Sequence, residues 1–393
     1  MSASTEKKNR QAAREAGTDK KALAAAEAAK KAAVSKRKWT IGTIAVAVFL
    51  ILVLLLNSSM FYTGTTAVKF NDKKASLADV NFNYASQYWN FTTTYGQYAS
   101  LFGLDTSNGI AGLAKQEYPT DEYSTWREYF LDAAVKQIQN FSALEDYAAE
   151  NGIALTEDEK AEILADFEGV DDSARTNGYA SADKLYTANY GKGNTLKTAE
   201  DFALLSSLVG KVTNAKTEEF LAALTDEEVA AAYPSIAVRH ILVKAEADEN
   251  GEYTDAAKEA AKAKAEEILQ EWKDGDATEE SFAALAEKYS EDEGSNTNGG
   301  LYDSVLQGQM VEEFDAFCFD ESRQSGDTGI VYGESGSYAG YHVMYFVGEG
   351  DPANNETGRN NLASEKLNTW LEELVGENEV QYTAAYRLLA GKI

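Results

Sequence analysis

The longest uncharged apolar stretch of the chain lies near its N-terminal end. Residues 39–68 contain no charged residue, and their apolar centre runs from Ile41 to Leu56. With its polar and aromatic edges, the stretch reaches the ~20 residues that a bilayer-spanning helix needs. It predicts a transmembrane signal anchor over residues 39–60. The alternative is a cleaved signal peptide, which is disfavoured because a long basic region precedes the stretch and no clear small-x-small site follows it.

Residues 63–233 have the pattern of a helical domain. A long helix is expected near 121–150, before Asn151-Gly152, and Pro234 is expected to end a short helix that begins at Thr225. Four Ser or Thr residues are each followed three positions later by an acidic residue, which is the pattern of a capping box. They are Ser76–Asp79, Thr156–Glu159, Thr198–Asp201 and Thr225–Glu228.

An aromatic stripe marks the first helix of this region. Its members are three or four positions apart and therefore share one helical face. They are Tyr84, Tyr88, Phe91, Tyr95, Tyr98 and Phe102. Two interpretations stay open. The stripe is either a packed core face or a partly open groove for unfolded chains, a role that suits tyrosine because its ring is apolar and its tip polar.

Strands and helices alternate in residues 235–350, which predicts a compact α+β domain with a small antiparallel sheet flanked by helices. The expected strands are rich in β-branched and aromatic residues and span 236–243, 330–332 and 341–347. The expected helices span 256–273, 281–289 and 311–319.

The last segment, residues 355–393, contains an amphipathic helix that Gly376 ends. Its apolar face consists of Leu367, Trp370, Leu371 and Leu374. Because a lone helix this apolar needs a partner, we expect it to dock on the helical domain 63–233. Residues 235–350 would then be an insertion between two parts of one helical domain. The predicted fold class is α+β, with an N-terminal transmembrane helix, a helical domain and an inserted α+β domain.

Charge is unevenly distributed along the chain. The net charge is −28, yet residues 1–38 hold eleven basic and four acidic residues, a net +7, which leaves −35 for the rest. The basic flank of a transmembrane helix faces the cytoplasm, so residues 1–38 are predicted to form a cytoplasmic tail and the later domains to be extracytoplasmic. An exterior this acidic repels nucleic acid, and no nucleic-acid partner is expected.

The chain has one cysteine, Cys318, and therefore no intrachain disulfide. Its phenylalanine neighbours favour a small buried hydrophobe over a catalytic thiol. An extracytoplasmic protein without disulfides fits a bacterial exterior better than a eukaryotic secretory route.

Candidate chemistry centres on the chain's two histidines, His240 and His342, each within an expected strand. Between them lie Tyr289-Ser-Glu-Asp292, Gly299-Gly-Leu301 and Gly308-Gln-Met-Val-Glu-Glu-Phe314. This ordered set resembles the parvulin family of peptidyl-prolyl cis/trans isomerases. The alternative is that both histidines are ordinary core residues. Two histidines without a nearby cysteine lack the ligands of a zinc site, so no metal is expected.

The resemblance implies an isomerase that needs no cofactor. It assigns the catalytic positions to His240, Asp292 and His342, and the two rings could hydrogen-bond to each other. It assigns the proline pocket to four further residues, namely Leu301, Met310, Phe314 and Ser337. Met310 and Phe314 are four apart on an expected helix and so share its face. The chain departs from the family's Gly-Gly-Asp-Leu-Gly at Gly299-Gly-Leu-Tyr-Asp303, and Ala339 stands where the family often has Ser or Tyr.

The whole layout resembles membrane-bound extracytoplasmic foldases of the PrsA type and, more distantly, SurA-type chaperones. The partners that this implies are unfolded exported polypeptides, which the helical domain would hold while the parvulin domain isomerises X-Pro bonds. A homodimer is left open. The acidic loop 246–252 would repel a phosphorylated residue, so unmodified X-Pro bonds are the expected substrate. The alternative functions are a binding chaperone with a catalytically silent parvulin domain and a structural envelope protein.

Overall fold

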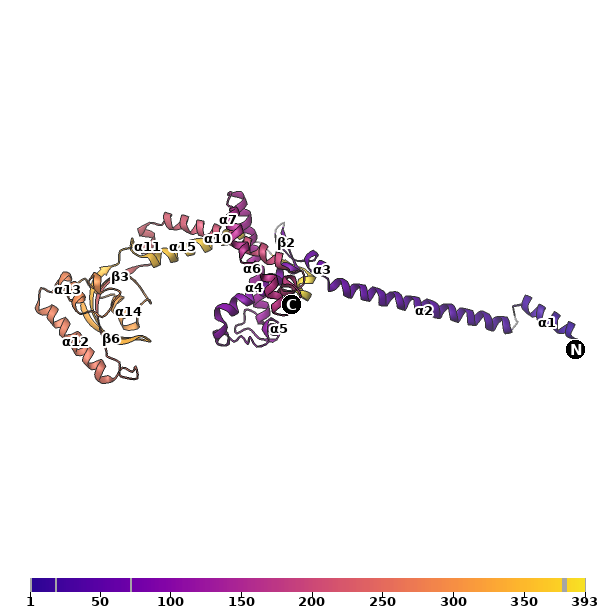
Figure 1. The fold of residues 1–393 in the computed structure, drawn as a ribbon, viewed down its shortest axis with the longest axis horizontal. Coiled ribbons are helices and arrows are strands. Elements are labelled where there is room, and N and C mark those ends of the chain that lie inside the picture. The colour runs from indigo at the N-terminus through magenta and orange to yellow at the C-terminus, as the bar shows by residue number, and fades with distance from the viewer. Residues whose placement is uncertain (1, 18–19, 71–72, 377–379, 393) are drawn as a thin grey trace. The chain divides into compact units, whose positions relative to one another are not determined.

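The computed structural model describes residues 2–17, 20–70, 73–376 and 380–392. The chain divides into two compact units (Figure 1). Unit 1 consists of residues 1–208 together with 377–393, and unit 2 consists of Val209–Gly376. Unit 1 therefore combines the beginning and the end of the chain.

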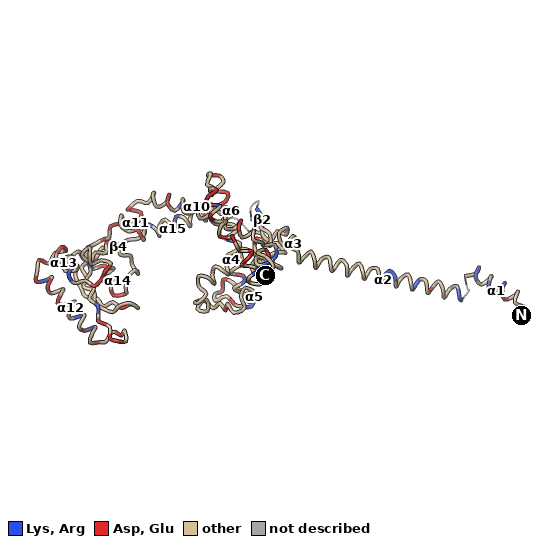
Figure 2. The backbone as a smooth tube through the Cα atoms, in the orientation of Figure 1, with Lys and Arg blue, Asp and Glu red and all other residues tan. Residues whose placement is uncertain are grey.

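Unit 1 begins with three helices, α1 (Ala3–Glu15), α2 (Lys20–Leu56) and α3 (Ser59–Gly64). In the part of the chain that the structure describes, one helical stretch, Leu23–Leu56, is long and apolar enough to cross a membrane. It covers residues 39–56 of the expected span 39–60, ends at Leu56, and continues into the basic segment before it. Figure 2 shows basic residues on α1 and on the first part of α2, and acidic residues through the later elements.

The remaining helices of unit 1 are short except for α4, α6 and α10. Their bounds are α4 Leu77–Tyr95, η1 Gly96–Phe102, α5 Gly109–Gly112, η2 Leu113–Lys115, α6 Trp126–Glu150, α7 Glu157–Ala165, α8 Val170–Thr176, α9 Ala182–Tyr190 and α10 Leu196–Ala223. The last of these continues beyond Leu208 into unit 2. The helix expected near 121–150 is α6, and it begins five residues later than expected because Thr125 caps it.

Three of the four expected capping boxes are present, at Ser76, Thr156 and Thr225. The capping box predicted at Thr198 is wrong, because the helix begins one turn earlier, at Leu196. Thr198 lies inside α10, and its backbone N–H donates to the Thr195 hydroxyl, while the Thr195 N–H donates to the Thr198 hydroxyl. Thr195 takes the capping position because it precedes the first helical residue.

A three-stranded sheet in unit 1 was not predicted from the sequence. Its antiparallel strands, in the order β2-β1-β7, are β1 Thr66–Phe70, β2 Lys73–Ser76 and β7 Gln381–Tyr382. The short helix α16 (Ala384–Leu389) follows β7 and contacts β1. Residues 355–393 therefore do not end as one helix. Strands this short offer too few alternating positions to be recognised by period.

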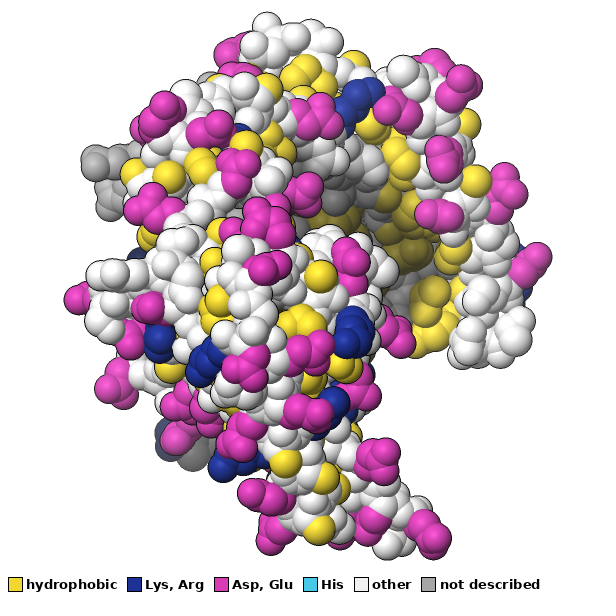
Figure 3. Space-filling view, turned by 90° about the vertical axis from the view of Figure 1, so that its left-hand side faces the viewer, with side chains coloured by type: hydrophobic (Ala, Val, Ile, Leu, Met, Phe, Trp, Pro, Cys, Tyr) yellow, Lys and Arg dark blue, Asp and Glu magenta, His cyan; other side chains and the backbone are white. Residues whose placement is uncertain are grey.

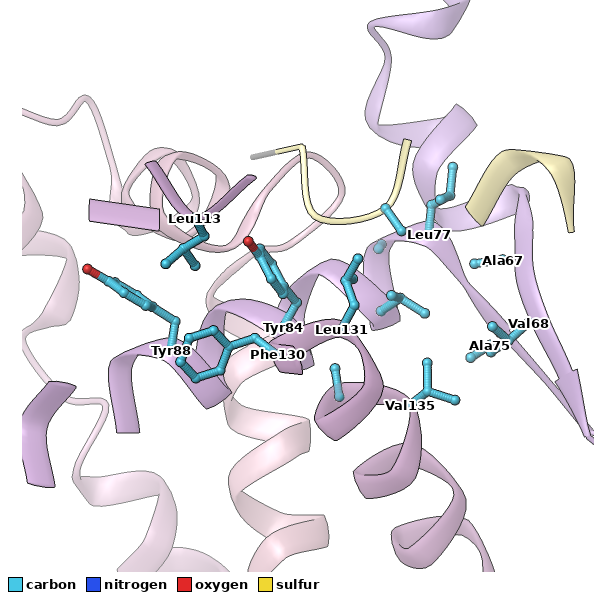
Figure 4. Close-up of a cluster of buried hydrophobic side chains, with 14 of the residues drawn as sticks. Ala67, Val68, Ala75, Leu77, Tyr84, Tyr88, Leu113, Phe130, Leu131 and Val135 are labelled. Atoms are coloured by element: carbon cyan, nitrogen blue, oxygen red, sulfur yellow. The ribbon is translucent and has the colours of Figure 1, made fainter. Parts of the chain in front are cut away.

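The core of unit 1 lies between β1, α4 and α6 (Figure 4). Tyr84 and Tyr88 of α4 are buried in it, and Phe130 and Leu131 of α6 pack against them. The first part of the aromatic stripe is therefore a packed core face. Ala390, which follows α16, is fully buried in the same cluster, so the end of the chain completes this core.

Unit 2 contains a four-stranded antiparallel sheet in the order β4-β3-β6-β5. Its elements are α11 Asp226–Ala232, β3 Ser235–Lys244, α12 Asp255–Asp274, α13 Glu279–Tyr289, η3 Asn296–Asn298, β4 Leu301–Leu306, α14 Glu312–Cys318, β5 Thr328–Ser335, β6 Tyr338–Glu349 and α15 Glu356–Val375. The expected strands and helices of this domain are present, and β4 was missed. The prediction of a mixed domain with a small antiparallel sheet is confirmed.

Each face of this sheet covers a separate core. Ile241 and Val343 pack under α12 and α13, whereas Met344 packs with Phe314 and Phe317 of α14 on the other face (Figure 1). Cys318 is buried in the second core, and this burial raises the pKa of its thiol to about 12. The thiol therefore stays protonated at neutral pH, as expected of a buried hydrophobe.

The helix α15 packs within unit 2. Its Leu362 and Ala363 contact Val229 of α11 and the last turn of α10. These partners fall inside the range 63–233 that was predicted to receive the helix, although the packed residues belong to unit 2. The expected apolar face at Leu367–Leu374 contributes less than Leu362 and Ala363 to this cluster. The segment that returns to unit 1 is instead β7 and α16.

Candidate active site

The sheet of unit 2 positions both histidines on one face. His240 of β3 lies opposite Met344 of β6, and Leu242 lies opposite His342. Because side chains alternate along a strand, His240, Leu242 and His342 share the face that α14 covers. The exposed fractions of His240 and His342 are 3% and 5%. Two neighbouring strands therefore bring the two rings together in a dry environment.

The buried histidines belong to a continuous chain of hydrogen bonds. The two Nδ1 atoms lie 3.0 Å apart. On the far side of His240, its Nε2 lies 3.0 Å from Asp292 Oδ2. On the far side of His342, its Nε2 lies 3.0 Å from the Tyr338 hydroxyl. The order along the chain is therefore Asp292, His240, His342, Tyr338.

Asp292 is held as a carboxylate by three donors. It lies in the loop after α13, where it bonds to His240, to the Ser295 hydroxyl and to the Tyr302 hydroxyl, which is 3.0 Å away. The hydrogen bond with His240 is the main reason that the pKa of Asp292 lies well below its usual range, against the opposing effect of partial burial. Burial and the Asp292 charge raise the pKa of Tyr302 to about 12, so this hydroxyl stays a donor.

With both rings neutral, the bonding partners fix which nitrogen of each ring carries its proton. A carboxylate only accepts, so Asp292 requires a proton on His240 Nε2 and leaves His240 Nδ1 as an acceptor. His342 must then donate from Nδ1, and its Nε2 accepts from the Tyr338 hydroxyl. Burial, with His240 beside it, lowers the pKa of His342 to about 3. His342 is therefore neutral at physiological pH.

An aromatic side chain packs against both histidine rings. Phe314 of α14 is buried and presents its ring edge-on to both histidines, with ring centres 5.4 Å from His240 and 5.3 Å from His342. Met310 is half-buried against the same core. It precedes α14, which begins at Glu312, so the expected sharing of one helix by Met310 and Phe314 is wrong, although both side chains reach the same cluster.

Two expected pocket residues lie elsewhere. Leu301 pairs with Arg239 in the β3–β4 ladder, whereas Tyr302 pairs with Val238 on the face of the histidines. Tyr302 therefore occupies the position expected for Leu301, because side chains alternate along β4 and only Tyr302 of the two is on the face of the histidines. Ser337 is exposed in the β5–β6 turn and bonds to Ser335.

Three polar contacts of the site were missed from the sequence. Tyr338, directly after Ser337, supplies the hydroxyl that reaches His342, and it stands four residues before that histidine on the same face of β6. Tyr302 and Ser295 both bond to Asp292. The alternation of β6 could have identified Tyr338, but the irregular loop that places Ser295 gave no such signal.

A glycine allows β3 and β4 to approach each other at the site. The backbone N–H of His240 donates to the Gly300 carbonyl at 2.9 Å. A Cβ at Gly300 would lie 2.2 Å from the His240 carbonyl oxygen, and its φ of +71° is one that few other residues adopt. Gly300 therefore keeps β4, and with it Tyr302, close to His240.

The aromatic stripe of unit 1 is divided between core and surface. Tyr84 and Tyr88 are buried, and Phe91 is half-buried. Tyr95 ends α4 and is 45% exposed, and Tyr98 lies in η1 and is 51% exposed. The proposed client groove therefore has only its second half available to a partner.

No group of three or more His, Cys, Asp or Glu side chains suited to a metal ion is found among the described residues.

The acidic loop after β3 is internally organised, because the Asp248 carboxylate accepts the backbone N–H groups of Asn250 and Glu252. Figure 3 shows Asp and Glu side chains scattered over the visible face among fewer Lys and Arg.

Comparisons with known proteins agree with the geometry. Residues 221–345 match the family described as PPIC-type PPIASE domain. The chain is 34% identical over 135 residues to Foldase protein PrsA 1 of Listeria innocua. The aligned residues make up 34% of this chain and 35% of the relative. It is 35% identical over 124 residues to Foldase protein PrsA 3 of Bacillus cereus, covering 31% and 35%. With Chaperone SurA of Chromohalobacter salexigens it shares 36% over 107 residues, covering 27% and 21%.

The resemblance inferred from the sequence motifs is thus confirmed. The isomerase-like segment is similar to foldases of the PrsA and SurA type. The matches span about a third of the length of the PrsA relatives, and 221–345 contains both histidines, Asp292 and Phe314.

Proposed function

We propose that the protein is a membrane-anchored extracytoplasmic foldase that isomerises X-Pro bonds in unfolded exported polypeptides. The observation that carries this proposal is the buried hydrogen-bonded series Asp292, His240, His342 and Tyr338 beneath Phe314. The ordinary core reading of the histidines explains it poorly, because a core does not need a charged carboxylate in line with two rings.

Prolyl isomerisation requires rotation about a bond whose barrier is about 18–20 kcal/mol, and no bond is broken. Resonance that charges the carbonyl oxygen holds the ground state planar, so an apolar pocket that removes water favours the twisted state. Phe314 and Met310 would contact the proline ring. His240, Asp292 and His342 would set the polarity and shape of the floor below it.

The substrate proposed is an unmodified X-Pro bond. A phosphorylated residue would meet Glu246, Asp248, Glu249 and Glu252 in the loop after β3. Their charge repels phosphate, and the Asp248 carboxylate is already fixed by backbone donors.

The location and partners follow from the N-terminal helix and the relatives. The helix Leu23–Leu56 would anchor the chain, with the basic tail in the cytoplasm and the residues after the helix outside. The isomerase domain would comprise residues 235–350, and the client would be held by the helical domain 63–233 through the exposed part of the aromatic stripe. The sequence analysis left a homodimer open, and sedimentation would test it.

The test is isomerase activity on a panel of X-Pro peptides by NMR exchange spectroscopy. His240→Ala and Asp292→Ala should each lower turnover by roughly tenfold or more, which corresponds to ~1.4 kcal/mol of transition-state stabilisation. Ser337→Ala is the matched control, since that hydroxyl lies in an exposed turn, and it should leave turnover unchanged. Equal activity in all variants would contradict the assignment of the site.

A second function is favoured by the exposed aromatic side chains Tyr95 and Tyr98. The protein could hold unfolded chains while its parvulin-like domain is catalytically silent. Absence of turnover in a folded sample, together with suppression of client aggregation that His240→Ala leaves intact, would select this function over the enzyme.

A further inference from the structure

Unit 1 contains a groove that neither the aromatic stripe nor the isomerase site uses. Its volume is about 650 Å³. It is lined by the end of β1, by β2, by the first turns of α4, by the middle of α6 and by the first half of α10. Its α4 residues, Asp79, Phe82 and Asn83, lie on the side of the helix opposite to Tyr84 and Tyr88.

The floor of the groove is aromatic. Phe202 of α10 stacks on Phe141 of α6 with ring centres 5.7 Å apart, and it contacts Phe82 of α4 at 5.1 Å. Phe82 is buried, whereas Phe141 and Phe202 are half-buried. Leu205 and Ile138 extend this apolar surface. Three helices thus leave a set of rings partly open to a ligand.

A nearly buried amide in the wall lacks a partner on one side. Asn83 is 8% exposed, and its Nδ2 donates to the Asp79 carbonyl at 2.9 Å. Its Oδ1 accepts no hydrogen bond from the described residues. Asn83 Oδ1 is not one of the fully buried side-chain atoms that lack a partner, so it is open to a ligand that donates an N–H.

The rim carries charges of both signs. Lys74 of β2 and Glu145 of α6 line the groove and form no ion pair with the described residues. The neighbouring Lys73 is occupied, because it pairs with Asp146 at 2.6 Å and donates to the Ser142 carbonyl. Asp79 also lines the groove, and its carboxylate bonds to Ser76 rather than to a cation. A rim with charges of both signs favours neither a phosphate nor a polycation, but it complements a peptide.

We propose that this groove binds an extended polypeptide segment through one aromatic side chain. The side chain packs on Phe141 and Phe202, a neighbouring backbone N–H donates to Asn83 Oδ1, and Lys74 and Glu145 contact polar groups of the segment. The inference rests on the proposed foldase function, for which it names a client contact in unit 1 that reads an aromatic residue rather than a proline.

The experiment uses the full chain in lipid nanodiscs and a blocked, proline-free hexapeptide with one 5-fluorotryptophan among Ser and Thr residues. Because the peptide has no proline, it does not test the isomerase site. Broadening of its ¹⁹F signal gives the dissociation constant. Phe141→Ser should weaken binding by about tenfold, as expected when a central aromatic contact is truncated. The same peptide with alanine in place of tryptophan should not bind.

Phe167→Ser is the matched control, because Phe167 is a partly exposed ring after α7 and lies outside both the groove and the aromatic stripe. It should leave the dissociation constant unchanged. A second readout guards against a folding defect: in the unsubstituted chain, the amide signals of Asn83 and Thr198 should shift as the peptide is added.

The outcomes separate this inference from the proposed function. Binding weakened by Phe102→Ser, a change in the aromatic stripe, and unaffected by Phe141→Ser would overturn the groove and leave the stripe as the client surface. Absence of peptide binding in a chain that still suppresses client aggregation would also overturn it. Binding that depends on Phe141 in a chain without isomerase activity would support the groove while the enzymatic proposal fails.

Discussion

At the scale of single residues, the site depends on which ring nitrogens of the two histidines carry protons. When His240 is neutral, its proton must lie on Nε2 for the ring to bond to both Asp292 and His342, and this requirement passes to His342 and ends at the Tyr338 hydroxyl. One carboxylate thereby orients two rings. The stacked rings, whose centres are 5.2 Å apart, are in turn held by the edge of Phe314.

We predict that His342 remains neutral at pH 5. Burial lowers its pKa to about 3, so its Nδ1–H tautomer should persist well below the usual titration range of histidine. The chain has only two histidines, so selective ¹⁵N-histidine labelling gives two rings whose tautomers can be read by long-range ¹H–¹⁵N correlation. A His342 ring that carries two protons at pH 5 would contradict the buried neutral arrangement.

The same lowered pKa links stability to pH. The unfolded His342 takes up a proton below about pH 6.5 while the folded ring does not, so acidification favours unfolding. At pH 5 the loss relative to pH 7.5 should be about 2 kcal/mol for this group. His342→Gln should remove that part of the pH dependence. Asp292, whose pKa is lowered, contributes a loss only below about pH 4, outside this window.

The sequence identified the residues of this site unevenly. His240, His342 and Asp292 carry their chemistry in their identity, and the strand pattern around the histidines predicted their placement. Tyr302 and Leu301 differ by one position, and that single step decides which of them faces the histidines. A register of this kind is set by the bulge between Ile236 and Val238 in the β3–β4 pairing, which is a tertiary feature that the sequence does not display.

At the scale of elements, signals within a few residues predicted well and pairings distant in sequence did not. The capping residues Ser76, Thr156 and Thr225 mark their helices because the cap is a contact between residues three apart. The pairing of β1 with β7 joins Val68 to Tyr382, and neither short strand has a pattern of its own. Its stability comes from the surrounding core, which only the folded chain contains.

We predict that the end of the chain stabilises unit 1. The Thr383 hydroxyl donates to the carbonyls of Thr66 and Ala67 and caps α16, so Thr383→Val should lower the free energy of unfolding by about 1–2 kcal/mol. The matched control is Thr369→Val, whose hydroxyl bonds only to Glu365 of its own helix in unit 2. Thermal and urea unfolding would measure both variants.

A larger change should have a larger effect on the same unit. A chain ended at Gly376 lacks β7, α16 and the buried Ala390, and unit 1 should lose on the order of 3 kcal/mol or more because partly buried Tyr386 and Leu389 leave its core. The isomerase turnover proposed for unit 2 should survive the truncation. Unchanged unfolding of unit 1 in both variants would show that the segment contributes no stability.

At the scale of the whole molecule, the two units are not two consecutive parts of the sequence. Unit 1 is interrupted by unit 2, since residues 1–208 and 377–393 share one core while Val209–Gly376 forms another. Completion of unit 1 therefore has to wait for the last residues of the chain. The net charge follows a simpler division, with +7 over residues 1–38 and −35 over the rest of the chain (Figure 2).

We predict that the apolar part of α2 anchors the protein in the membrane with the later residues outside. A lysine at the centre of such a helix disfavours insertion by about 2.5–3.5 kcal/mol, so a chain with both Val46→Lys and Leu50→Lys should be released by alkaline carbonate while the unsubstituted chain stays with the membrane. Val34→Lys is the control, because Val34 lies on the same helix within the basic segment and should not affect anchoring. Protease added to intact cells without a cell wall should digest both units. Protection of both units, or release of the unsubstituted chain, would contradict the anchor, and a shortened N-terminus on the mature protein would favour the cleaved signal peptide instead.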